Sequence, residues 1–196
     1  MFWLTLAVVL WGVLHSITAS LGFKEILRRT FGAGFMKLYR LLYNAFSVLS
    51  FTPILYLMTT QPDATLFRVP PPLSVLMLAG QGVSLLLLVV TVLQTDTLSF
   101  IGLRQLMDED KPGRLVTTGF YRAMRHPLYT FGLLLLWLSP RMSVNSLIVY
   151  ASLTVYILVG AYFEERKLLR EFGREYADYR NVTPMLVPRL RFRGNK

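Results

Sequence analysis

Apolar residues gather into five runs along the chain, at about residues 2–21, 41–58, 73–93, 128–138 and 144–163. Continuous apolar stretches of about 20 residues predict helices that cross a membrane. The fourth run is shorter, because at ~1.5 Å per residue it covers only about 16 Å, roughly half of a ~30 Å hydrocarbon core. We expect it to be tilted, extended at its ends, or one arm of a helical hairpin with the fifth run, turning at Ser139-Pro140-Arg141.

The first run could be mistaken for a secretory signal peptide, and Ala19-Ser20 could mimic a cleavage site. No basic residues precede it, however, and Trp11 and His15 interrupt it. A signal peptide carries a basic stretch before its apolar region. We therefore expect a retained first helix.

The polar stretches differ in charge, and this difference predicts the orientation in the membrane. Of the 21 Lys and Arg residues, only Arg68 and Arg141 lie after the second and fourth runs. The others follow the first run, follow the third run, or lie in the C-terminal tail. Loops rich in Lys and Arg stay on the cytoplasmic side. The pattern predicts an all-α, polytopic membrane protein with five transmembrane helices, its N-terminus outside and its C-terminus cytoplasmic.

The last apolar run is expected to continue as an amphipathic C-terminal helix beyond the bilayer. Apolar side chains recur at three- and four-residue steps at Leu168, Leu169, Phe172, Tyr176 and Tyr179. Such spacing places them on one helix face. Gly173 should weaken this helix by ~1 kcal/mol relative to Ala. The helix can lie on lipid, cover a pocket, or do both.

Composition supports a membrane protein and excludes several kinds of chemistry. The hydrophobic share is 54%, which is too high for an ordinary soluble domain. The net charge of +10 is carried beside apolar segments, which favours anionic lipid headgroups over nucleic acid as the partner. Cysteine is absent, so the chain has no disulfide and no catalytic thiol. No group of His and carboxylate residues has metal-ligand spacing, so no metal site is expected.

Two polar clusters flank the last two apolar runs and are the candidates for chemistry. Arg125 and His126 precede Pro127, a residue suited to the first turn of a helix. Exposed N–H groups at such a helix start, with Arg125 and His126, would form an anion site. Glu164 and Glu165 follow the fifth run. If the two runs form an antiparallel hairpin, both clusters lie at the same membrane surface.

Each cluster also has a simpler interpretation. The Arg-His-Pro stretch can be a positively charged flank with a proline at the helix start. The Glu pair can be the point where a helix leaves the bilayer, with Glu164 pairing with Lys167. Spacing alone does not choose between these interpretations and a binding pocket.

A set of motifs in the C-terminal half resembles the membrane methyltransferase superfamily, which includes isoprenylcysteine carboxyl and phospholipid methyltransferases. The motifs are R-H-P-L-Y, an apolar hairpin, E-E, then F-G-R-E-Y-A-D-Y and the closing P-M-L-V-P. In the first half, L-H-S, Y-R-L-L-Y-N and F-I-G-L-R-Q are similar to a bacterial branch. That branch includes methanethiol S-methyltransferases and the NnrU proteins.

The resemblance implies S-adenosylmethionine as cofactor on the cytoplasmic side, with the acceptor entering from the membrane. The length of 196 residues predicts one domain over residues 1–196. Residues 1–100 would form a three-helix scaffold, and residues 101–196 the cofactor-binding linker, the hairpin and the C-terminal helix. The expected cofactor-binding residues are Leu115, Val116, Gly119, Tyr121, Arg125, His126, Pro127, Tyr129, Glu164 and Glu165.

The candidate catalytic residues are Glu165, His126 and Asp96, with His15 as a further possible proton acceptor. A thiol acceptor must lose a proton, whereas a carboxylate acceptor needs no base. The branch favours a small or lipophilic thiol as the acceptor. An isoprenylcysteine carboxylate, a phospholipid amine, and a non-catalytic role of the NnrU type are the alternatives.

Overall fold

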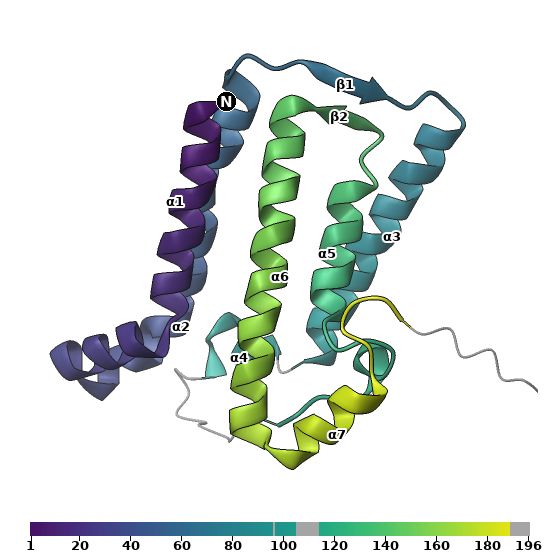
Figure 1. Cartoon of the computed structure of the whole chain (residues 1–196). Coiled ribbons are helices and arrows are strands. Elements are labelled where there is room, and N and C mark those ends of the chain that lie inside the picture. The colour runs from purple at the N-terminus through teal and green to yellow at the C-terminus, as the bar shows by residue number, and fades with distance from the viewer. Residues whose placement is uncertain (96, 105–113, 189–196) are drawn as a thin grey trace, which may run out of the picture. The chain divides into compact units, whose positions relative to one another are not determined.

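The computed structural model describes residues 1–95, 97–104 and 114–188, and within these ranges most residues are helical (Figure 1). The helices are α1 (Phe2–Ala19), α2 (Leu21–Thr60), α3 (Leu73–Gln94), α4 (Thr97–Ile101), α5 (Pro127–Trp137), α6 (Val144–Phe172) and α7 (Arg174–Val182). A 3-10 helix covers Gly119–Arg122, and the two strands are β1 (Thr65–Arg68) and β2 (Arg141–Ser143).

Among the described residues, four helices are long and apolar enough to cross a membrane: α1, α2, α3 and α6. Their ends agree closely with four of the predicted apolar runs, except that α2 begins earlier and α6 ends later. Helix α5 has 11 residues and is the short apolar helix that the fourth run predicted. The mostly helical fold is thus confirmed, with four candidate membrane-spanning helices among the described residues. The fifth span and the orientation in the membrane stay predictions.

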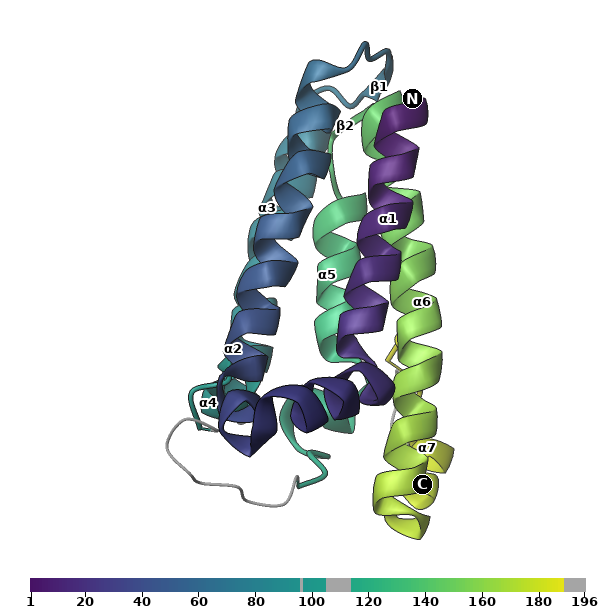
Figure 2. The same cartoon turned by 90° about the vertical axis from the view of Figure 1, so that its left-hand side faces the viewer.

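The basic stretch after α1 is helical, which corrects its expected assignment as a loop. It forms the first part of α2, where the Ser20 hydroxyl accepts a hydrogen bond from the Phe23 N–H at 3.2 Å. Capping of this kind and the Glu25–Arg29 pair one turn apart, at 2.9 Å, stabilise a helix start. The non-helical backbone inside α2 lies at Gly32 (φ 80°), and Pro53 lies farther along the same helix. Figure 2 shows the first part of α2 turning sideways from the end of α1.

A short antiparallel sheet joins the connection after α2 to the connection before α6, and the sequence pattern did not predict it. Thr65 pairs with Ser143 and Arg68 with Arg141. The Asp63 carboxylate accepts a hydrogen bond from the Asn145 N–H at 3.0 Å, which caps the start of α6. Strands of three and four residues are too short to show a period-two pattern.

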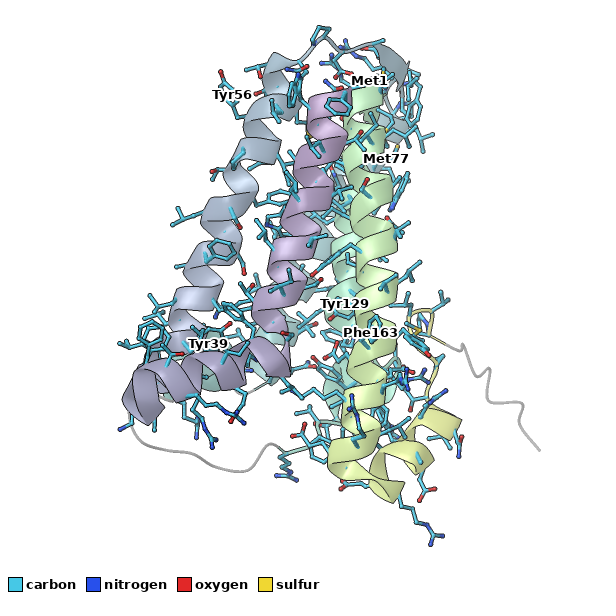
Figure 3. All side chains as sticks on the ribbon, turned by 60° about the vertical axis from the view of Figure 1, so that its left-hand side comes forward. Met1, Tyr39, Tyr56, Met77, Tyr129 and Phe163 are labelled. Atoms are coloured by element: carbon cyan, nitrogen blue, oxygen red, sulfur yellow. The ribbon has the colours of Figure 1, made fainter. Side chains whose placement is uncertain are left out.

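Two compact units divide the chain. The first contains α1, α2, the two strands, α4 and α6 as far as Tyr156. Its core is formed by Leu4, Val8, Ile54 and Val149. Most other large apolar side chains of α1 are exposed and project outward (Figure 3), as expected for helix faces in contact with lipid.

The second unit contains α3, α5, the 3-10 helix, α6 from Ile157 and α7. Helix α5 packs along α3, where the Gln81 side-chain amide donates to the Leu135 carbonyl at 2.7 Å. Gly80 allows this close packing, because an added Cβ there would lie 3.0 Å from Leu138. Gly82 makes no such contact, since nothing lies within 4 Å of an added Cβ. This unit carries the candidate site.

Candidate functional site

The Arg-His-Pro stretch is fixed by the segment that follows α7. Pro127 is the first residue of α5 and His126 is its N-cap. The backbone N–H of Arg125 donates to the Pro184 carbonyl at 2.9 Å, and that of His126 to the Met185 carbonyl at 3.0 Å. These two N–H groups are therefore bonded within the chain and are not available to an anion.

Glu165 lies at the centre of a buried ionic cluster. Its Oε1 is 2.6 Å from Nη2 and 2.7 Å from Nε of Arg125, and 3.3 Å from Nε2 of His126. Its Oε2 is 3.7 Å from Nε of Arg180. The side chains of Arg125 and Glu165 are each only 10% exposed. Removing one member of such a pair is costly, because the remaining charge stays buried without compensation.

Glu164 is the more accessible carboxylate of the pair, with its side chain 44% exposed. Tyr129, labelled in Figure 3, donates its hydroxyl to Oε2 of Glu164 at 2.7 Å. Nδ1 of His126 lies 3.6 Å from the same oxygen, and the His126 ring stacks on the Tyr129 ring at 5.2 Å. The His126 imidazole thus lies between the two carboxylates and contacts both.

Arg125 also ties the end of α7 to the start of α5. Its Nη1 donates to the Arg180 carbonyl at 3.1 Å and to the Thr183 carbonyl. Carbonyls at a helix C-terminus carry partial negative charge and attract a guanidinium. Nε, Nη1 and Nη2 of Arg125 are all engaged within the protein.

Helix α7 reaches this position because α6 ends at Gly173. Gly173 has φ 54° and ψ −122°, a backbone conformation that residues other than glycine rarely adopt. Figure 1 shows α7 turning back from the end of α6. The expectation of one continuous helix through Gly173 is therefore wrong. The apolar side chains predicted for its face are nevertheless buried or half-buried in α6 and α7. Tyr176 on that face is 1% exposed.

Two tyrosines beside the cluster hold their protons strongly. Burial, followed by the negative charge of Glu164, raises the pKa of Tyr121 to about 12. Burial also raises the pKa of Tyr179, with the Tyr176 phenol as the second cause. The Tyr179 hydroxyl donates to the Tyr121 carbonyl at 2.5 Å and so fastens α7 to the 3-10 helix.

The structure brings together seven of the residues predicted for the site. They are Tyr121, Arg125, His126, Pro127, Tyr129, Glu164 and Glu165. It also adds Arg180, Thr183 and Tyr176, which the sequence analysis did not select as site residues. The repeated tyrosines of the F-G-R-E-Y-A-D-Y motif were a signal for Tyr176, whereas Arg180 carried none.

The other predicted residues have different positions. Leu115 and Val116 lie half-buried in an irregular segment before the 3-10 helix. Gly119 has φ 61° and is held against Gln94, whose side-chain oxygen accepts the Phe120 N–H at 3.0 Å. Asp96 lies outside the described residues.

His15 belongs to the first unit and contacts a different set of residues. Its Nε2 lies 2.7 Å from the Tyr43 hydroxyl, and its ring stacks on Trp11 at 4.9 Å. The Tyr156 ring of α6 contacts the His15 ring edge-on, with 5.8 Å between the two ring centroids. A polar group inside apolar helices is stabilised by such partners.

Comparison with known proteins gives a consistent set of similarities. The family model described as "NnrU protein" matches residues 3–191. "Methanethiol S-methyltransferase 2" of Bradyrhizobium diazoefficiens is 50% identical over 70 residues, which are 36% of this chain and 27% of that protein. "Methanethiol S-methyltransferase" of Pseudomonas deceptionensis is 36% identical over 95 residues, 46% of this chain and 36% of that protein.

A third relative, "Methanethiol S-methyltransferase" of Crocosphaera subtropica, is 41% identical over 92 residues, 44% of this chain and 36% of that protein. The matched parts thus span between 27% and 36% of these three curated relatives. No solved structure matches the chain.

Proposed function

We propose that this chain, which belongs to the NnrU protein family, is an integral-membrane methyltransferase that transfers a methyl group from S-adenosylmethionine to a small or lipophilic thiol. The proposal rests on the cluster of Arg125, Arg180, Glu164 and Glu165 beside His126. The formal charges of these two Arg and two Glu residues cancel, and part of the cluster is exposed. The relatives named methanethiol S-methyltransferase favour a thiol as the acceptor.

The residues of the cluster fit the amino-acid end of S-adenosylmethionine. That end is a zwitterion, with one ammonium and one carboxylate group. Two guanidiniums and two carboxylates balance each other, so a zwitterion can enter without leaving a net buried charge. Glu164, with its side chain 44% exposed, is the carboxylate available to the ammonium group. Glu165 is enclosed by its own partners and holds the cluster together.

The remaining parts of the cofactor would contact the residues around the cluster. The rings of Tyr121 and Tyr129 offer aromatic faces to a sulfonium. Leu115, Val116 and Gly119 supply apolar contact and backbone groups for the adenine, while Pro127 and the segment after Thr183 enclose the site. When bound, S-adenosylmethionine supplies an electrophilic methyl group on its sulfonium sulfur.

The contribution of the protein to methyl transfer is to orient the reacting groups and to exclude water. The acceptor sulfur must lose a proton before it forms its bond to carbon. His126 lies within 3.6 Å of both carboxylates, and we propose it with Glu165 as the proton-accepting pair. Asp96 and His15 are the alternative bases.

The proposed membrane arrangement keeps the cofactor site on the cytoplasmic side. Five membrane-embedded helices would run from an outside N-terminus to a cytoplasmic C-terminus, and α5, with 11 residues, would cross only part of the bilayer. The acceptor would enter from the lipid, and the basic tail would contact anionic headgroups.

A methyl-transfer assay with purified protein in lipid nanodiscs tests this proposal. Radiolabelled S-adenosylmethionine is offered with a small thiol, an isoprenylcysteine or a phospholipid amine, and the methylated products are separated. We expect label in the thioether product, and little with Glu164→Gln. Transfer to either alternative acceptor would reassign the substrate. Cofactor binding without transfer to any acceptor would favour a non-catalytic role.

A further inference from the structure

Tyr176 has a buried hydroxyl group that the rest of the described chain leaves without a hydrogen bond. The residue lies in the first turn of α7 and is 1% exposed. Its hydroxyl has no hydrogen-bond partner among the described residues. Buried hydroxyl groups are nearly always bonded, because water satisfied them in the unfolded chain. An unpartnered hydroxyl at this depth therefore indicates a group that binds something else.

The surroundings of Tyr176 show which kind of group would satisfy it. The charges of Glu165, Arg125, Glu164 and Arg180 all act on the phenol. Burial and the nearby Glu165 carboxylate raise the pKa of Tyr176 to about 12, so the hydroxyl keeps its proton and remains a donor at neutral pH. A protonated phenol beside the ionic cluster suits an anionic oxygen.

The other donors of the cluster are already in use. Arg125 directs Nε and Nη2 at Glu165, and Nη1 at two backbone carbonyls. The backbone N–H groups of Arg125 and His126 are bonded to the segment after α7. Arg180 has its side chain 48% exposed and lies 3.7 Å from Glu165, farther than Arg125 does. Arg180 and Tyr176 therefore have side-chain donor atoms that these contacts do not occupy.

We propose that the Tyr176 hydroxyl, together with Arg180, binds the carboxylate of the methyl donor's amino-acid end. This inference rests on the proposed function and adds a residue to its site. Glu164 then takes the ammonium group, and Arg125 positions Glu165 and α7 without contacting the cofactor. The Gly173 break places Tyr176 in this role by turning α7 back from the end of α6.

Tyr176→Phe removes only the hydroxyl, and Tyr179→Phe is its matched control, because the Tyr179 hydroxyl is bonded to the Tyr121 carbonyl. Calorimetric titration compares two probes on the full chain in detergent. S-adenosylhomocysteine has the amino-acid end, and 5′-methylthioadenosine lacks it. We expect Tyr176→Phe to weaken S-adenosylhomocysteine binding about tenfold, since a hydrogen bond to a charged group is lost, and to leave 5′-methylthioadenosine binding unchanged. Tyr179→Phe should change the affinities for the two probes by the same factor.

The melting temperature of the ligand-free protein provides a second readout. Tyr176→Phe should melt at the same temperature as the wild type or higher, because no internal hydrogen bond is lost. A lower melting temperature would overturn the inference by showing that the hydroxyl has a structural partner. Unchanged S-adenosylhomocysteine affinity, or equal loss of both probes, would overturn it as well. A folded wild type that binds neither probe would instead refute the proposed function.

Discussion

Glu164 and Glu165 are adjacent in sequence, but the structure predicts different effects when each is neutralised. Glu165 is enclosed by Arg125, His126 and Arg180, with contacts from 2.6 to 3.7 Å. Glu164 is bonded mainly to the Tyr129 hydroxyl and has its side chain 44% exposed. We expect Glu165→Gln to reduce stability and Glu164→Gln to reduce cofactor binding.

The magnitudes follow from burial. Removing one charge of a buried pair costs ~3–5 kcal/mol. Arg125 keeps its two carbonyl acceptors after the change, so we expect the lower end, about 3 kcal/mol, for Glu165→Gln. Glu164→Gln should change the free energy of unfolding by less than about 1 kcal/mol, because exposed ion pairs contribute little. Losing a charged contact to the ammonium group should weaken binding by about 2 kcal/mol, roughly 30-fold.

Two measurements separate these effects. Unfolding in mixed micelles titrated with dodecyl sulfate gives the stability of each variant, and calorimetry with S-adenosylhomocysteine gives the affinity of the folded protein. Glu164→Gln should unfold like the wild type and bind weakly. Equal stability of the two variants, or a larger loss for Glu164→Gln, would refute the assignment of Glu165 as the buried centre of the cluster.

Three further predictions concern the residues around the cluster. Tyr129→Phe removes the 2.7 Å hydrogen bond to Glu164 and should weaken S-adenosylhomocysteine binding by about 1 kcal/mol in calorimetry; unchanged affinity would contradict it. Gly119→Ala should lower the melting temperature, because its φ is 61° and the added Cβ would lie 2.4 Å from Gln94; an unchanged melting temperature would show that this turn relaxes freely. The pKa of Tyr121 is raised to about 12 from about 10 in the unfolded chain. Its stabilising contribution is therefore complete below about pH 10 and lost as the pH rises toward about 12. Over that pH range the free energy of unfolding should fall less for Tyr121→Phe than for the wild type. An equal fall in both proteins would contradict the raised pKa.

The sequence was sufficient for the features that depend on length and hydropathy. The limits of α1, α3 and α5 agree with the predicted runs to within about two residues, because a helix in lipid must satisfy its own backbone and stay apolar. The meeting of Arg125 and His126 with Glu164 and Glu165 was also predicted, since an antiparallel hairpin brings its two ends together.

Local backbone geometry could not be predicted in the same way. Gly32 and Gly173 both break helices, but helix propensity scores a glycine only as a small penalty and does not give its φ. The basic start of α2 is helical because of Ser20 and the Glu25–Arg29 pair, and hydropathy does not detect such contacts.

The sequence also could not predict which hydrogen-bond donors are already bonded within the protein. Whether the Arg125 guanidinium was free to bind a ligand depended on where the carbonyls of Arg180 and Thr183 lay. Those carbonyls come from a segment about 55 residues later in the chain. Only tertiary structure determines which of several cations remains available to an incoming anion.

The central claim is that the cluster of Arg125, Arg180, Glu164 and Glu165 holds a zwitterionic methyl donor. Calorimetric titration of the full chain with S-adenosylhomocysteine, beside Glu164→Gln, tests this claim most directly. The account predicts saturable binding of one ligand per chain by the wild type and roughly 30-fold weaker binding by the variant. A folded wild type that gives no binding heat, or a Glu164→Gln variant that binds equally well, would contradict it.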